Sequence, residues 1–161
     1  MEEAIPKIEK KANNILKDVL DGFTVRFDTK KTKSTKSTKK TKDEDVSFTF
    51  KIMVEKKDGF CIPLQALSGG EKVQIEAAIA LSSIIYTQSV AKRKLSVMFL
   101  DESDGPLDNM NLDKFFVMIQ KAHAEAGCKQ TIFITHRLEH LPADINKIIL
   151  KKEKGFKIEI A

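Results

Sequence analysis

Two stretches decide the fold of this chain: Leu67-Ser68-Gly69-Gly70-Glu71 and, beginning thirty residues later, Val97-Met98-Phe99-Leu100-Asp101-Glu102. In the first, Ser68 followed three residues later by Glu71 predicts a helix start closed by a capping box. The two glycines leave first-turn amides uncovered, and free amides at the positive end of a helix attract phosphate. The stretch is therefore a phosphate-contacting helix start or, alternatively, only a capped helix that needs a close approach.

The second stretch predicts a buried parallel strand that ends in two acids. The apolar run Val97–Leu100 is typical of a central strand covered on both faces. Open α/β sheets bind their ligands at the carboxyl ends of such strands. At that position Asp101 can hold Mg²⁺, which prefers hard oxygen ligands, and Glu102 can orient and deprotonate a water molecule. The alternative is an ordinary acid pair on a solvated turn.

Two more candidate site residues, Asp108 and His136, lie downstream of these stretches. Asp108 follows a Gly- and Pro-containing turn, where it either serves a site or only caps the next helix. His136 ends the predicted strand Thr131–Thr135, where an imidazole can hydrogen-bond a terminal phosphate or be a bystander. No GxxxxGK[ST] phosphate loop occurs in the 161 residues, which include only seven glycines. The chain thus carries candidate phosphate- and metal-contacting residues without the loop that normally holds a nucleotide.

The N-terminal part predicts a helix and a small antiparallel layer. Apolar residues recur every three or four positions over residues 3–20, as in an amphipathic helix packed on the domain or the stub of a coiled coil. Phe23–Phe27 and Val46–Ile52 alternate apolar and polar residues, as half-buried strands do. A third short strand is expected at Phe60–Leu64. We therefore expect a coiled-coil stub over residues 1–20 and one domain over residues 21–161, with a mobile basic loop at 28–45.

The C-terminal part predicts a strand–helix–strand unit. A helix from Ser68 to about Gln88 is apolar around most of its circumference and belongs in an interior. A second helix follows Asp108, with Gly127 as its stop. The last two apolar segments of the chain, Lys147–Leu150 and Phe156–Ile160, predict a closing hairpin. The expected class is α/β, with parallel strands, flanking helices and the small antiparallel layer.

Composition and charge limit the cellular locations and the partners that we expect. No apolar run approaches the length that spans a bilayer, and the N-terminus lacks a secretory signal. Cys61 and Cys128 fit no metal or redox spacing, so we expect buried, reduced thiols in a cytoplasmic protein, or a nuclear one in a eukaryote. The net charge of +5 depends on the seven lysines of the tract 30–42, without which it is −2. Only this tract, at Lys36, Lys39 and Lys40, is a candidate DNA contact; a solvated loop is the alternative.

Taken together, the motifs resemble the C-terminal half of an ABC-type ATPase head. The signature motif matches Leu67–Glu71, the Walker B strand Val97–Glu102, the D-loop Ser103–Asp108, and the switch histidine His136. Such a head binds ATP and Mg²⁺. The resemblance implies that Asp101 coordinates Mg²⁺, that Glu102 is the general base and that His136 contacts the γ-phosphate.

The same resemblance implies a second set of roles across a dimer of heads. Ser68, Gly69 and Gly70 would close over ATP bound to the opposite head, and Asp108 would lie at the dimer interface. An N-terminal lobe carrying the Walker A loop would be required as a partner. The isolated chain is accordingly expected to hydrolyse almost no ATP.

Within the superfamily, three features resemble the SMC-like SbcC family of double-strand-break repair ATPases. They are the signature ending in Glu71, the spacing from Asp101 to Asp108, and the segment Ala12–Leu16 before the first strand. This resemblance implies DNA and an SbcD-type nuclease as partners, and no membrane. Two alternatives stay open: another ABC-type machine, such as a chromosome-organising SMC, a recombination mediator or a transporter subunit, and a non-enzymatic dimerisation module.

Overall fold

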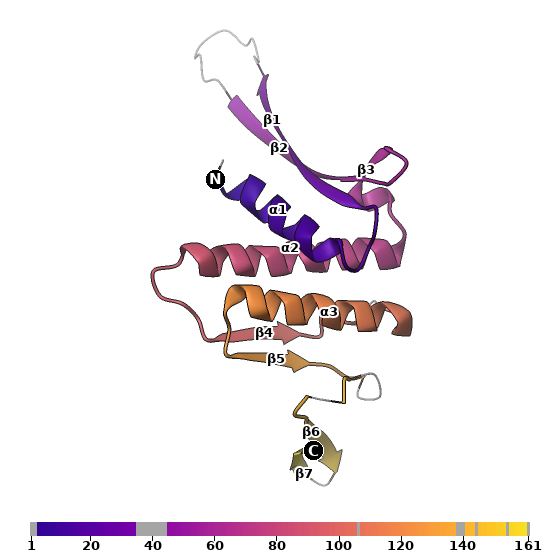
Figure 1. Ribbon diagram of the computed structural model, residues 1–161, viewed down its shortest axis with the longest axis vertical. Helices are drawn as coiled ribbons and strands as arrows, with labels where there is room; N and C mark the ends of the chain where they lie inside the picture. The colour runs from indigo at the N-terminus through magenta and orange to yellow at the C-terminus, as the bar shows by residue number, and fades with distance from the viewer. Residues whose placement is uncertain are drawn as a thin grey trace.

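The computed structural model stacks its elements along one long axis (Figure 1). It describes residues 3–34, 45–105, 107–137, 141–143, 145–153 and 155–160. In chain order the elements are α1 (Ala4–Leu16), β1 (Thr24–Ser34), β2 (Asp45–Glu55), β3 (Cys61–Pro63), a 3₁₀ turn (Leu64–Ala66), α2 (Gly69–Val90), β4 (Val97–Asp101), α3 (Asn109–Ala126), β5 (Gln130–Ile134), β6 (Ile148–Glu153) and β7 (Gly155–Ile160). The described strands form an antiparallel sheet β1-β2-β3, a parallel pair β4-β5 and an antiparallel hairpin β6-β7.

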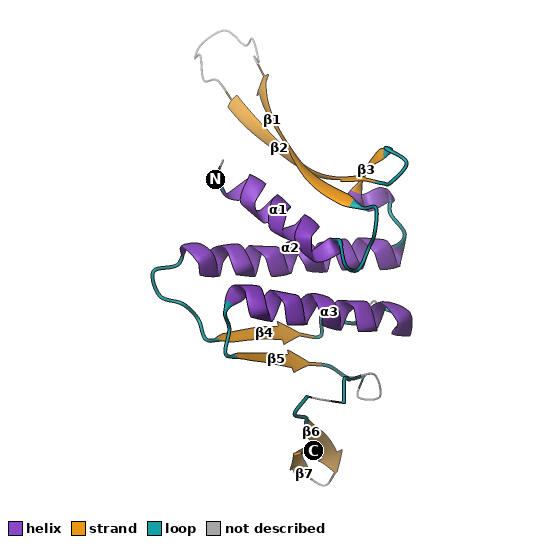
Figure 2. Cartoon of the chain, in the orientation of Figure 1, coloured by secondary structure: helices purple, strands orange, loops and turns teal. Residues whose placement is uncertain are grey.

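Helix α2 is the central layer, with α1 on one side and α3 on the other (Figure 2). Its buried positions face both neighbours and are Gln74, Ile75, Ala78, Leu81, Ser82, Ile85 and Gln88. A helix that packs on two sides needs apolar residues around most of its circumference. The prediction that this helix lies in the interior is confirmed.

Helix α1 joins the antiparallel sheet to the helical core. Its C-terminal half is buried, through Ala12, Ile15 and Leu16. The Asn13 side chain makes two hydrogen bonds with the edge of β1, donating to the Val25 carbonyl at 3.0 Å and accepting from the Val25 amide at 2.7 Å. Side chains of α1 thus take the place of a neighbouring strand along β1.

Polar contacts also join α1 to α3. The Lys121 ammonium donates to the Asp18 carboxylate at 2.6 Å and to the Asn14 carbonyl at 2.5 Å. The hydrogen bond from Lys121 lowers the pKa of Asp18. The Asn14 amide donates to Glu125 at 2.8 Å. Helix α1 is therefore held from both sides, by the sheet and by α3.

The antiparallel layer differs from the prediction at its ends. β1 continues to Ser34 and β2 begins at Asp45, with Ser34 paired to Asp45. Both ends of the predicted loop 28–45 are therefore strand, because backbone pairing extends past the apolar alternation that marked the strands in the sequence. Residues 35–44, with Lys36, Lys39 and Lys40, lie outside the described residues.

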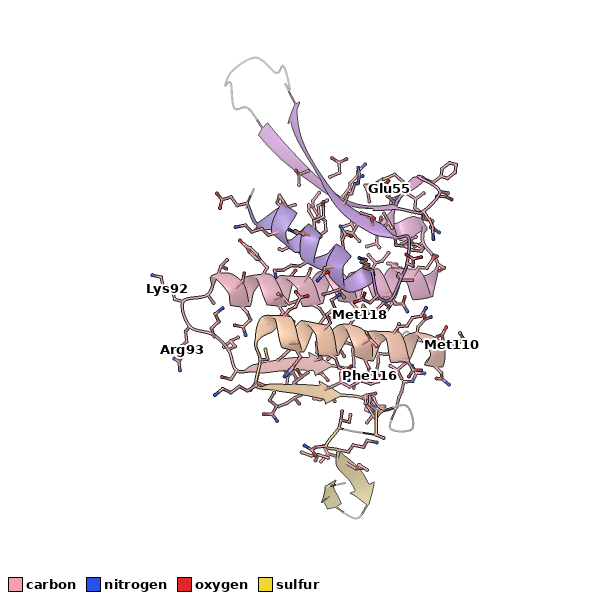
Figure 3. The ribbon with its side chains drawn as sticks, in the orientation of Figure 1. Glu55, Lys92, Arg93, Met110, Phe116 and Met118 are labelled. Atoms are coloured by element: carbon pink, nitrogen blue, oxygen red, sulfur yellow. The ribbon has the colours of Figure 1, made fainter. Side chains whose placement is uncertain are left out.

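The parallel pair β4-β5 has helices on one face only. Met98 is buried, at 2% exposed, and the Phe133 ring lies 5.4 Å from that of Phe116 on α3 (Figure 3). On the other face Phe99 is 57% exposed, and Val97, Ile132 and Ile134 are also exposed. The prediction of a strand covered on both faces is wrong for the described chain, because no described element packs against this second face.

The remaining predictions concern the cysteines, the C-terminus and membranes. Cys128 is buried as expected, but the prediction is wrong for Cys61, which is exposed at the start of the edge strand β3. The strands β6 and β7 form the expected hairpin, with Leu150 paired to Ile158. Among the helices of the described residues, none combines the length and the apolarity required to cross a membrane.

The Asn13 contact gives a first prediction. Asn13→Ala removes two hydrogen bonds and leaves the Val25 amide and carbonyl unpaired, so it should lower the free energy of unfolding by about 1–3 kcal/mol in urea denaturation. The matched control is Asn14→Ala, whose exposed side chain donates only to Glu125 and should cost about 0.5 kcal/mol or less. Equal losses in the two variants would contradict this role of Asn13.

Candidate active site

Apart from the lysines outside the described residues, the predicted site residues gather at one end of the layers formed by α2, α3, β4 and β5. Helices α2 and α3 begin at the end where β4 and β5 finish, as Figure 1 shows. Met110, in the first turn of α3, projects from this end in Figure 3 and is 80% exposed. The parallel pairing of β4 and β5 places the acids after one strand beside the histidine after the other.

Glu102 and His136 are in direct contact. The Nε2 atom of His136 lies 2.7 Å from Oε1 of Glu102, and both side chains are exposed. Glu102 has a φ of 44°, the one left-handed backbone among the described non-glycine residues. Its amide still donates to the Ile134 carbonyl at 3.0 Å, so the parallel ladder continues to this residue before the chain turns. A left-handed glutamate is strained backbone held by its surroundings, and such strain concentrates at functional sites.

Asp101 lies on the uncovered face of the sheet. Side chains alternate along a strand, so Asp101 shares its face with Val97 and Phe99. It is exposed, and no described side chain donates a hydrogen bond to its carboxylate. No group of three or more His, Cys, Asp or Glu residues in the described chain is arranged to hold a metal ion. The donor set therefore fits Mg²⁺ only as one protein carboxylate beside phosphate and water oxygens, a usual arrangement for this ion.

The first turn of α2 has the predicted capping box. The Glu71 carboxylate accepts from the Ser68 amide at 3.1 Å and from the Ser68 hydroxyl at 2.7 Å. The hydroxyl bond from Ser68, more than the lysine Lys56 at 3.5 Å, lowers the pKa of Glu71. A side chain added at Gly69 would meet no atom within 4 Å, so this part of the turn is open to an approaching group.

Gly70 has a neighbour on α3. A Cβ at this position would lie 3.1 Å from the side-chain nitrogen Nδ2 of Asn111. Asn111 also accepts from Gln74 on α2 at 2.6 Å and donates its backbone amide to Asp108 at 2.8 Å. Asp108 is the cap of α3, as one reading of the sequence held. Asn111, which the sequence analysis did not single out, links the first turn of α2, called the signature turn below, to the segment before α3 that resembles a D-loop.

Arg137 is the second residue that the sequence reasoning missed. Its guanidinium donates to the carbonyls of Leu107 and Asp104, the latter at 3.4 Å, and to the Asn109 side chain at 2.6 Å. The Thr135 hydroxyl donates to the Asp104 carboxylate at 2.5 Å. The end of β5 therefore holds the D-loop through two side chains. The only signal in the sequence is that both residues flank His136.

Comparison with known proteins places these features in a family context. Over 92 residues, 57% of its length, the chain is 36% identical to the chromosome partition protein Smc of Thermoplasma acidophilum, and it spans 7% of that protein. No protein-family model matches the chain. The assignment to the SbcC family stays a prediction.

Solved SMC heads have the same fold. A structure from work on ATP-driven dimerization and DNA-stimulated activation of SMC ATPases has a TM-score of 0.63 at 20% identity, covering 99% of this chain and 86% of that one. The SMC head bound to the C-winged helix domain of ScpA has a TM-score of 0.64 at 16% identity, covering 99% and 44%. The SMC head of Thermotoga maritima has a TM-score of 0.57 at 17% identity, covering 99% and 49%. The chain thus has the fold of an SMC ATPase head and spans under half of two of these chains.

The Ser68–Glu71 contact gives a prediction for acid pH. Because the pKa of Glu71 is lowered on folding, the contact stabilises the fold above the unfolded pKa and loses this effect as the pH falls through the folded pKa. Ser68→Ala should therefore raise the pKa of Glu71 in a carbon-13 NMR titration, and should cost less stability in acid than at neutral pH. The control is Ser83→Ala, whose hydroxyl donates to the Ile79 carbonyl. An unchanged titration of Glu71 in Ser68→Ala would contradict the assignment.

Proposed function

We propose that this chain is the C-terminal half of an SMC-type ATPase head that acts on DNA. The observation that carries the proposal is the uncovered apolar face of β4-β5, which leads directly to Asp101 and to the Glu102–His136 pair. A water-exposed sheet face with Phe99 and two isoleucines on it is suited to burial against another element. A lobe carrying the Walker A loop that packed there would bring its phosphate-binding amides to the acids at the strand ends.

The chemistry proposed for this site is ATP hydrolysis. Bound ATP and Mg²⁺ would supply the phosphate to be transferred and the charge that neutralises it. Asp101, exposed and without a described donor, would give one oxygen ligand to the ion. Glu102 would accept a proton from the attacking water on its carboxylate, with His136 orienting that carboxylate from 2.7 Å. His136, which is exposed, would in turn donate from Nδ1, the ring nitrogen not engaged with Glu102, to a γ-phosphate oxygen.

A second head would complete the site. Ser68, Gly69 and Gly70 lie at a helix start that is open at Gly69, a geometry suited to a phosphate approaching from another molecule. Asp108 caps the start of α3, where the exposed Met110 projects (Figure 3), and both would meet the partner head. This arrangement agrees with the ATP-driven dimerization described for SMC ATPases of the same fold.

Two branches of the family compete for the cellular role. The similarity to a chromosome partition protein favours a chromosome-organising SMC, for which a ScpA-type winged-helix domain would be a partner. The motif spacing described above favours an SbcC-type repair ATPase working with an SbcD-type nuclease. In either branch, the lysines Lys36, Lys39 and Lys40 are proposed to contact the phosphate backbone of DNA.

Assembly of the head tests the proposal. The chain alone should show no ATP turnover above background, because it supplies no cradle for the β- and γ-phosphates. Co-purified with a Walker A lobe of the same protein, it should turn ATP over, and linear DNA should raise the rate. The measurement is steady-state phosphate release with and without DNA.

The other outcomes of that experiment each test a separate part of the proposal. Turnover by the chain alone would show that the Walker A lobe is not required for hydrolysis. A stable assembly without turnover would contradict the ATPase proposal and favour a non-enzymatic dimerisation module. Capture of a ScpA-type domain or of an SbcD-type nuclease by the assembled head would decide between the branches. If changing Lys36, Lys39 and Lys40 to glutamine left the salt dependence of DNA binding unchanged, the tract would not be a DNA contact.

The role of Glu102 gives a further prediction. In the assembled head, Glu102→Gln should leave ATP binding intact and slow hydrolysis by about 10²–10⁴-fold, the usual contribution of a general base. The control is Glu76→Gln, an exposed carboxylate paired with Lys72 on the same chain, which should leave both unchanged. Binding by a fluorescent ATP analogue and single-turnover hydrolysis separate the two steps. Normal hydrolysis in Glu102→Gln would show that another group takes the proton.

A further inference from the structure

The end of β5 presents two functions on its two faces. Exposure alternates along the strand and past its end: Ile132, Ile134 and His136 are exposed, whereas Phe133, Thr135 and Arg137 are partly buried. This is the period of extended backbone, in which neighbouring side chains point to opposite sides. His136 therefore faces Glu102 and the nucleotide side, while Arg137 faces the D-loop.

Arg137 makes an unusually complete set of contacts with that loop. Its guanidinium reaches two backbone carbonyls, of Asp104 and Leu107, and the Asn109 side chain at the start of α3. Carbonyl contacts of this kind fix the path of the loop whatever its side chains are. The planar guanidinium makes these bonds from two nitrogens in a fixed fork, whereas a lysine has all its donors on one atom.

A second contact acts beside it. The Asp104 carboxylate is 3% exposed and accepts from the Thr135 hydroxyl at 2.5 Å, while the same hydroxyl accepts from the Arg137 amide at 2.9 Å. A buried carboxylate needs such a partner, because an unpaired one is costly. The D-loop is thus attached to residues 135 and 137, on either side of His136, and a shift of this strand end would be transmitted to the loop.

We infer that Arg137 is a positioning residue that couples His136 to the dimer-facing D-loop, so that nucleotide contact at His136 sets the loop in the conformation that a second head binds. This inference rests on the proposed function. It assigns Arg137 no contact with the nucleotide. Its predicted effect is therefore on association of heads and not on binding of ATP by one head.

The first arm of the test uses this chain alone and is independent of ATPase activity. Arg137→Ala should speed hydrogen exchange of the Leu107 amide, which donates to the Asp104 carbonyl, by about tenfold or more, with exchange in β4 unchanged. Arg93→Ala is the matched control, an exposed arginine on the loop between α2 and β4, at the opposite side of the helical layers, labelled in Figure 3. Unchanged exchange at Leu107 would overturn the inference, whatever the protein hydrolyses.

The second arm uses the assembled head with Glu102→Gln, so that ATP is bound without being consumed. Adding Arg137→Ala should weaken ATP-dependent dimerisation in analytical ultracentrifugation by about tenfold or more, with ATP affinity of the single head within about twofold. The dimerisation of Arg137→Lys should be weaker than that of the parent and stronger than that of Arg137→Ala. Combining Arg137→Ala with His136→Ala should weaken dimerisation little more than either change alone.

The outcomes separate the two proposals. Dimerisation as strong as in the parent, or an equal loss of ATP binding, would overturn the coupling role of Arg137. If the parent head formed no ATP-dependent dimer, the proposed function would fail, and the exchange result at Leu107 would still decide whether Arg137 holds the loop.

Discussion

The parallel pairing of β4 with β5 is the constraint on which the site depends. Parallel strands end at the same sheet edge, so residues that follow them come together although they are far apart in the chain. The register pairs Asp101 with Ile134, and the Glu102 amide extends the ladder by one more bond to Ile134. A slip of one residue would turn Phe133 away from α3 and separate Glu102 from His136.

Helix packing fixes the second half of the site relative to the first. Helix α2 carries the signature turn at its start, and α3 begins directly after the D-loop. Gln74, 1% exposed, donates to Asn111, and Asn111 binds Asp108, so the two helix starts are held by a short polar chain inside an apolar interface. The Oε1 atom of Gln74 is the one buried side-chain polar atom without a partner in the described chain. An unpaired buried amide oxygen is unfavourable, and this one lies at the junction of two motifs, where Gln74 also fixes the position of Asn111.

The sequence predicted what short-range patterns encode. The capping box at Ser68, the interior position of α2, the strand end at Asp101 and the position of His136 just beyond β5 follow from local spacing and apolar runs. Local patterns could not give the Arg137 contacts or the Thr135–Asp104 bond, which join residues about thirty positions apart through side chains with no periodic signal. The left-handed backbone of Glu102 was equally hidden, because glutamate has no preference for it.

The incorrect prediction about β4 has a physical reason that bears on the site. An apolar run reports that both faces of a strand avoid water, but it does not report which chain segment covers them. Here α3 covers one face, and Val97 and Phe99 on the other face are exposed beside Asp101. The apolar face and the proposed catalytic acids are adjacent because side chains alternate along one strand, with Asp101 two residues beyond Phe99. Any element that buries the face must therefore also approach Asp101 and lower the dielectric constant around the acids, which strengthens their electrostatic interactions. Completing the fold and completing the catalytic environment would thus be one event.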